Sequence, residues 1–250
     1  MQAGLIPERL KIIGIPVHPE LAKGKQDRAS IRKVLERDPE LFTVLAVGSK
    51  RVENIYESLH ALNHSGLPLQ LVVVAGGDDG LYQRFEQVEW HREAHLYNFV
   101  TDMATLMRAS DCVLGKAGGL TVSESLACGL PLILINVVPG QETGNAEYVT
   151  HGNAGDLAPD PVGVLDTLCH WLEKGGEMYK TRSKNARSLG RPQAAYEAAE
   201  LTWAAALAPS NVPLPWNSSM ASLLIGWNTS VMSNMGPNKR RRSHDNVDER

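Results

Sequence analysis

Residues 111–149 read DCVLGKAGGLTVSESLACGLPLILINVVPGQETGNAEYV, and this stretch decides the fold class. It predicts a strand, a glycine-rich turn, a helix, a second strand, a loop and a further helix. Both strands are apolar along their whole length instead of alternating with polar residues. Such strands are typical of a parallel sheet that is covered on both faces.

The same alternation of apolar strands and helices continues over residues 9–208, which we expect to form one domain. The predicted strands are 11–17, 43–48, 70–76, 95–100, 111–115 and 130–136. Helical spacing separates them, and helical runs follow at 159–175, 177–189 and 192–208. The alternation predicts a doubly wound, Rossmann-like parallel α/β sheet. Since ligands of such sheets bind beyond the carboxyl ends of the strands, function should be sought at the strand–helix junctions.

Composition narrows the function classes. The chain has 250 residues, a formal net charge of -3 and three cysteines. The charge gives no reason to expect nucleic acid, and the scattered cysteines favour neither a disulfide framework nor a zinc site. No apolar run is long enough to cross a bilayer, so we expect a cytoplasmic protein that meets a membrane only peripherally. Residues 209–250, rich in Pro, Asn, Ser and Met, predict a poorly ordered tail.

The first candidate site is the turn from Lys116 to Leu120. Glycines at 118 and 119 let a ligand approach the backbone, and the start of a helix opening at Thr121 favours a negative group such as a diphosphate. Lys116 would add a positive charge. The simpler interpretation is a tight strand–helix turn, and glycine spacing alone favours it.

Glu124 also has two interpretations. Thr121 and Glu124 fit a capping box, in which Thr121 is the N-cap and Glu124 reaches back to it. As a ligand, the Glu124 carboxylate would accept hydrogen bonds from the two hydroxyls of a ribose. The loop 139–145 (PGQETGN) gathers amide and carboxylate groups suited to sugar hydroxyls, or to a solvated, capped helix start.

In order along the chain, several short motifs resemble the C-terminal domain of glycosyltransferase family 28, a GT-B fold. The matching pieces are GIPV at 14–17, NFV at 98–100, DM at 102–103, KAGG at 116–119, Thr121 with Glu124, GLP at 129–131, and PGQE at 139–142 with Asn145. The likeness is strongest to the monogalactosyl- and glucosyl-diacylglycerol synthases and also extends to the lipid II N-acetylglucosaminyltransferase.

The resemblance implies a UDP-sugar site and a role for each matching residue. Phe99 and Val100 would contact the uracil, and Glu124 would hold the ribose. Gln141 and Glu142 would hold the sugar, with Asn145 nearby. The diphosphate would lie against Lys116, Gly118, Gly119, Leu120 and Thr121.

Two positions depart from the family pattern. The turn after 43–48 keeps one glycine, Gly48, where the family has a wider glycine-rich loop. Gly76-Gly77-Asp78 replaces a Gly-Arg-Asn or Gly-Lys-Asn sequence, so a basic contact is lost. Phosphate neutralisation would then depend more on Lys116.

The resemblance further implies a hexosyltransferase that moves a sugar from UDP to a lipid acceptor with inversion. No metal ligands or cofactor are expected. The acceptor-binding N-terminal half, with its general base, would be supplied in cis or by a separate chain. Alternatives are a non-catalytic donor-binding subunit and a UDP-sugar epimerase fragment. A dehydrogenase fits poorly, since no G-x-G-x-x-G follows the first strand.

Overall fold

A computed structural model gives the fold, and it describes residues 10–21 and 27–207. The chain divides into two compact units, Met1–Ala204 and Ala205–Arg250. Only residues 205–207 of the second unit are described, as the end of a helix, and the predicted tail at 209–250 lies outside the described residues. The sheet lies in the first unit.

Six parallel strands form one sheet in the order β3-β2-β1-β4-β5-β6. This is the strand order of the doubly wound dinucleotide-binding fold. The strands are β1 (Phe42–Val47), β2 (Leu69–Val74), β3 (Ala94–Tyr97), β4 (Cys112–Lys116), β5 (Leu132–Asn136) and β6 (Gly155–Leu157).

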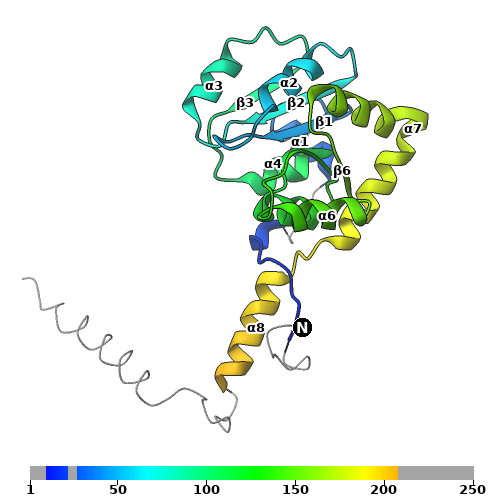
Figure 1. Cartoon of the computed structure of the whole chain (residues 1–250). Helices are drawn as coiled ribbons and strands as arrows, with labels where there is room; N and C mark the ends of the chain where they lie inside the picture. Colours follow the sequence, from blue (N-terminus) through cyan, green and yellow to red (C-terminus); the bar gives the residue numbers. More distant parts are fainter. Residues whose placement is uncertain (1–9, 22–26, 208–250) are drawn as a thin grey trace, which may run out of the picture. The chain divides into compact units, whose positions relative to one another are not determined.

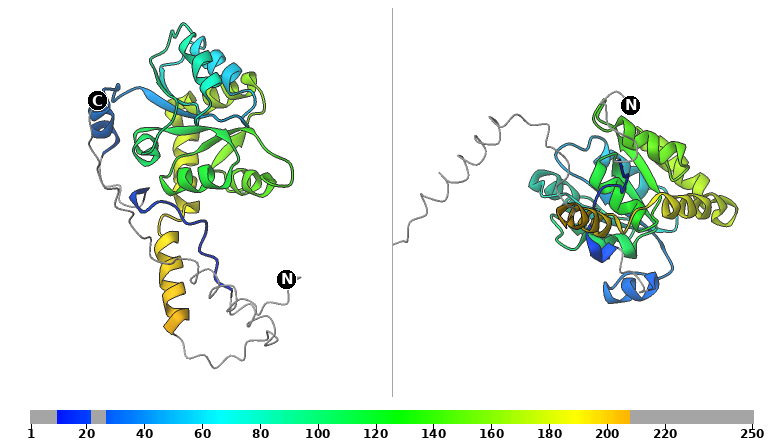
Figure 2. Two further views of the ribbon diagram at one scale, coloured as in Figure 1. Left: turned by 90° about the vertical axis from the view of Figure 1, so that its left-hand side faces the viewer. Right: turned by 90° about the horizontal axis from the view of Figure 1, so that it is seen from below.

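Helices cover both faces of the sheet (Figures 1 and 2). One core contains side chains of α2, α3 and the start of α7, and the other contains side chains of α4, α5, α6 and the end of α7. The helices are η2 (Pro19–Leu21), α1 (Arg28–Val34), α2 (Ile55–Asn63), α3 (Asp79–Glu86), α4 (Met103–Ala109), α5 (Gly119–Ala127), α6 (Thr143–His151), α7 (Pro161–Leu189) and α8 (Ala194–Leu207).

Strand β1 illustrates why the sheet needs two cores. Val44 and Ala46 belong to the core under α2 and α3, whereas Leu45 between them belongs to the core under α4 and α5. All three are fully buried. Since successive side chains of a strand point to opposite faces, an unbroken apolar strand is stable only when both faces are covered. The predicted doubly wound parallel sheet is confirmed.

A break inside α7 lets one helical segment reach both cores. Val164 and Trp171 pack in the first core, and Ala186 packs in the second. Between them Glu173 leaves the helical conformation, and Lys174, Gly175 and Gly176 adopt left-handed backbone angles. The two helical runs predicted at 159–175 and 177–189 correspond to the two halves.

The strand predicted at 11–17 is wrong. This segment is irregular, Gly14 has a φ of +87°, and Ile12 is 89% exposed. Pro16 has no N–H to give to a strand ladder, and the turn at Gly14 breaks the extended path. Conversely, the short edge strand β6 was not predicted, because three residues carry too little periodicity.

A buried ion-pair network closes the amino end of β4. The Asp111 carboxylate pairs with Arg28 and Arg32, with Arg32 Nη2 2.5 Å away, and accepts the Thr43 N–H at 2.7 Å. Arg32 is only 4% exposed. The network ties α1 to the two central strands.

We expect Asp111→Ala to lower the free energy of unfolding by about 3–5 kcal/mol, because it leaves the buried Arg32 guanidinium without its counter-charge. Urea denaturation would measure the loss. Glu57→Ala is the control, since the Glu57–Arg84 pair is more than half exposed and should matter by less than about 1 kcal/mol. Equal effects of the two substitutions would contradict the prediction.

Candidate functional site

The strand order reverses between β1 and β4, and the candidate site lies at the carboxyl ends of these strands. From β1 the chain proceeds to β2 on one side, whereas β4 and β5 follow on the other. Such a switch point opens a crevice for ligands. The strands approach closely there: a Cβ added to Gly115 would lie 3.2 Å from the Val47 carbonyl oxygen.

Beyond β4 the glycine turn leads directly into α5. The Ala117 N–H donates to the Asn136 carbonyl at 3.0 Å, which fixes the turn to β5. Gly118 is the N-cap, with φ -66° and ψ 135°, and no side chain caps the helix. The first N–H groups of a helix have no acceptor within it, and the helix dipole adds partial positive charge. The turn is therefore suited to an anion.

The capping-box interpretation of Thr121 and Glu124 is wrong. Helix α5 begins at Gly119, so Thr121 lies within its first turn and is not the N-cap. Glycines 118 and 119 adopt the angles that start a helix, which moves the start ahead of the predicted residue. Glu124 is thereby left free of a capping role.

Lys116 and Glu142 form a salt bridge beside Gly118. Lys116 Nζ lies 2.6 Å from Glu142 Oε1, and the other carboxylate oxygen accepts the Val138 N–H at 3.1 Å. The Glu142 side chain is only 4% exposed, whereas that of Lys116 is 26% exposed. A Cβ on Gly118 would lie 3.4 Å from Lys116 Cε. The partly open ammonium group thus lies over the turn, held by a buried carboxylate.

Asn145, in the first turns of α6, supports the same turn from the other side. Its amide nitrogen donates to the Ala117 carbonyl at 2.9 Å. The amide nitrogen also lies 3.6 Å from the Cβ position of Gly119. The structure therefore brings together five predicted residues, Lys116, Gly118, Gly119, Glu142 and Asn145, at one helix start.

Glu124 of α5 lines a separate cavity of about 520 Å³ together with residues of η2 and α4. Thr101, Asp102, Arg108 and His18 also line it. Burial raises the pKa of Glu124, and the nearby His18 opposes the shift. The Asp102 carboxylate, which accepts the Thr105 N–H at 3.0 Å, has a lowered pKa chiefly because of its hydrogen bonds to Thr105.

Phe99 and Val100 line a smaller cavity of about 290 Å³ at the end of β3. This cavity shares Thr101 and Asp102 with the cavity of Glu124. Phe99 is 70% exposed, which leaves a large aromatic ring open to a stacking partner. The predicted base-contacting residues are therefore neighbours of Glu124, across the loop that begins α4.

Three predicted residues lie more openly. Leu120 is 62% exposed on the first turn of α5, and Thr121 is half-buried beside it. Gln141 is exposed in the loop between β5 and α6. Their side chains are thus accessible at the same end of the sheet.

The two departures from the family pattern have structural reasons. A Cβ on Gly76 would lie 2.3 Å from the Gly48 carbonyl oxygen, so the turns after β1 and β2 pack backbone to backbone. Asp78 is the N-cap of α3 and accepts the Leu81 N–H at 3.2 Å. Gly77, with a φ of +79°, stands at the position of the family's basic residue, and Asp78 after it stabilises the start of α3.

Arg108 and His18 were not predicted as site residues, although both line the cavity of Glu124. Neither residue belongs to a local motif or spacing that would mark it. Only the packing of α4 against η2 brings them to Glu124. Within residues 10–21 and 27–207 no group of three His, Cys, Asp or Glu could hold a metal ion. No helix in those ranges is long and apolar enough to span a membrane.

Fold and site together define a Rossmann-like domain with a glycine turn suited to an anion at its switch point. Residues 27–189 match the family described as glycosyl transferases group 1. The chain belongs to this family of enzymes.

Comparisons with individual proteins agree with the family. The chain is 32% identical over 202 residues to monogalactosyldiacylglycerol synthase 3 of Arabidopsis thaliana, covering 78% of this chain and 43% of that protein. It spans about two fifths of the length of the curated relatives it matches.

Among solved structures, the lipopolysaccharide glycosyltransferase WaaG matches with a TM-score of 0.59 and 22% identity over 78% of this chain and 57% of WaaG. Anabaena HepE, solved with UDP-glucose, matches with a TM-score of 0.57 and 19% identity over 81% of this chain and 60% of HepE. At these identities the likeness is one of fold, and it is the GT-B fold that was expected.

We expect the two carboxylates of the Glu124 cavity to affect stability with opposite signs. A raised pKa in the folded state means that ionised Glu124 is disfavoured, so Glu124→Gln should stabilise the protein at neutral pH. The lowered pKa of Asp102 means that Asp102→Asn should destabilise it there. Both differences should vanish as the pH falls and the carboxylates become protonated.

Thermal unfolding of both variants and the parent across a pH series would measure these differences. Each variant is the other's control. The same sign for both substitutions at neutral pH would contradict the prediction.

Proposed function

We propose that the chain is the donor-binding half of a hexosyltransferase that takes its sugar from UDP. The observation that supports this most directly is the Lys116–Glu142 pair over Gly118 at the start of α5. A diphosphate is the common ligand that needs a cation, free backbone N–H groups and room for close approach together. Gly118, Gly119, Leu120 and Thr121 would supply the backbone groups.

The uridine would occupy the adjoining cavities. The half-buried carboxylate of Glu124 would accept hydrogen bonds from the ribose hydroxyls, and the exposed ring of Phe99 with Val100 would contact the uracil. Their shared wall at Thr101 and Asp102 makes one nucleoside a reasonable occupant of both. The complex of HepE with UDP-glucose supports a UDP-sugar in this fold.

The sugar would lie toward the loop before α6, where Gln141 is exposed and Asn145 is anchored. For Glu142 we infer an indirect role. Both of its carboxylate oxygens are already engaged and the side chain is almost fully buried. Glu142 would therefore act as a positioning residue that holds Lys116 toward the diphosphate, leaving Gln141 to contact the sugar.

The reaction we propose is a single displacement with inversion. An acceptor hydroxyl forms a bond to the anomeric carbon as the bond to the UDP oxygen breaks, and the hydroxyl proton passes to a base outside this chain. Negative charge develops on the departing diphosphate. The α5 dipole, the turn N–H groups and the Lys116 ammonium would stabilise it in place, without reorganisation.

The acceptor we propose is a membrane lipid, and the narrower family assignment is glycosyltransferase family 28. The ordered motifs at 98–103, 116–124 and 139–145 and the diacylglycerol-synthase relatives support both. The acceptor-binding half would be supplied in cis or by a separate chain, with peripheral membrane contact.

Calorimetric titration should show tighter binding of UDP than of ADP.

Glu124→Ala should weaken the binding of UDP and of uridine alike, by about 1–3 kcal/mol, since it leaves the ribose hydroxyls unpaired. Lys116→Met should weaken UDP by about 1.5–3 kcal/mol but leave uridine unchanged, because it removes a charged partner of the phosphates only. Lys180→Met, on the exposed face of α7, is the matched control.

A double-mutant cycle tests the positioning role of Glu142. Glu142→Gln should weaken UDP in the parent chain and have no further effect in Lys116→Met, because it acts through the lysine. Equal binding of UDP and ADP would reject the uracil assignment. Additive effects of the two substitutions would show that Glu142 touches the ligand itself.

The chain alone should transfer no sugar to lipid vesicles until an acceptor-binding half is added. Radiolabelled UDP-galactose and UDP-glucose with diacylglycerol vesicles would measure transfer. Turnover by the chain alone would show that the acceptor site and the base both lie within it.

A further inference from the structure

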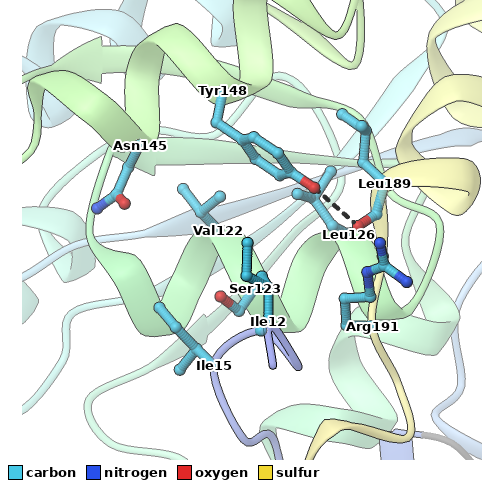
Figure 3. Close-up of a pocket in the computed structure, with 11 residues that line it drawn as sticks. Ile12, Ile15, Val122, Ser123, Leu126, Asn145, Tyr148, Leu189 and Arg191 are labelled. Atoms are coloured by element: carbon cyan, nitrogen blue, oxygen red, sulfur yellow. Dashed lines mark hydrogen bonds between the residues drawn. The ribbon is translucent and has the colours of Figure 1, made fainter. Parts of the chain in front are cut away.

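A cavity of about 360 Å³ lies beside the glycine turn, where Val122, Ser123 and Leu126 of α5 line it (Figure 3). The irregular segment before η2 forms one wall and the end of α7 another, with α5 and α6 between them. Its lining is mostly apolar and includes Ile12, Ile15, Val122, Leu126 and Leu189. No residue given a role in donor binding lines this cavity except Asn145.

The contacts of the polar residues leave much of the cavity wall apolar. The Tyr148 hydroxyl donates to the Leu189 carbonyl at 3.2 Å, so its polar group is satisfied and its ring forms the wall. The Arg191 stem packs on Gly14, where an added Cβ would lie 3.0 Å from Arg191 Cβ. Ile12 is 89% exposed. Exposed apolar surface around a cavity favours an apolar occupant, since its burial releases water.

One end of the cavity reaches the glycine turn at the start of α5. Ile15 and Asn145 line it, and the same two side chains lie 3.3 Å and 3.6 Å from the Cβ position of Gly119. Asn145 uses its amide nitrogen on Ala117, which leaves its oxygen able to accept a hydrogen bond. The cavity thus has Asn145 at the glycine turn, an apolar middle formed by Ile12, Val122 and Leu126, and the Arg191 side chain beside Leu189 at its far end.

We propose that this cavity holds one acyl chain of the lipid acceptor, with the lipid's free hydroxyl at the Asn145 end. The proposal rests on the proposed glycosyltransferase function and adds that the donor half itself contributes to acceptor binding. An amphiphile with an apolar chain and a hydroxyl head matches the apolar middle of the cavity and the free amide oxygen of Asn145, as in other sites that combine apolar walls with few polar groups. A soluble acceptor would leave the apolar middle unfilled.

Photolabelling of the full chain tests this. The probe is a diacylglycerol with a diazirine near the end of one acyl chain, and short-chain dioctanoylglycerol is the competitor. We expect saturable labelling that the competitor removes, with cross-linked peptides from the segments 12–15, 122–126 and 189–191. Cross-links in other segments, or labelling that does not saturate, would overturn the proposal. This outcome can be read from the parent chain alone.

A substitution that fills the cavity provides a second test of the labelling. Ser123→Trp places a large ring in the cavity from a half-buried helix position and should lower labelling about tenfold or more. Thr181→Trp, on the exposed side of α7, should leave it unchanged. If Ser123→Trp labels like the parent, the cavity does not hold the chain. If it instead abolishes binding of a supplied acceptor-binding half while labelling persists, the cavity is a protein-docking site.

UDP titration of the same preparations separates the two proposals. Saturable, site-specific labelling without UDP binding would keep the acyl site and reject the donor function. UDP binding without labelling would support the donor function and reject the acyl-chain site.

Discussion

Burial of both faces of a parallel sheet is the constraint on which the rest of this structure depends. Parallel strands cannot be joined by tight turns. Each connection must run back over one face of the sheet before the next strand begins. Leu45 faces one core while Val44 and Ala46 face the other. Each crossover therefore carries a helix onto one face or the other. All strands then end at one edge, and six junctions are available there for ligands.

The order of the strands decides which junction becomes the site. β1 and β4 are neighbours whose connections leave in opposite directions, so no helix crosses directly above the gap between them. The glycine turn after β4 lies in that gap and starts α5. Burial of the Glu142 carboxylate costs desolvation energy, which its contacts with Lys116 and the Val138 N–H offset. The pair fixes a positive charge where the helix dipole already favours an anion.

Local sequence patterns predicted most strands of the sheet. They failed where the structure depends on contacts between residues far apart in the sequence. Continuous apolar runs identified β1 to β5, because burial on both faces leaves a strong signal along the chain. The segment at 11–17 has the same apolar composition but packs on α5 and α7 as irregular chain, which composition cannot distinguish from a strand. The helix start at Gly119 was displaced because Thr121 and Glu124 imitate a capping box. Motif resemblance found Lys116 and Glu142, yet only the structure shows that they bind each other.

The misassigned segment and the broken helix have a common consequence. Covering both faces requires α7 to change sides, and left-handed residues at 174–176 permit it. Its second half then ends at Leu189 beside α5, where Gly190 fits against the Leu126 carbonyl with no room for a side chain. The irregular segment enters the same region because Gly14 turns it under Arg191. The two chain segments thus form a mostly apolar cavity against the glycine turn. The path that completes the core also places an apolar cavity next to a polar site, the combination that the proposed transfer of a sugar to a lipid would use.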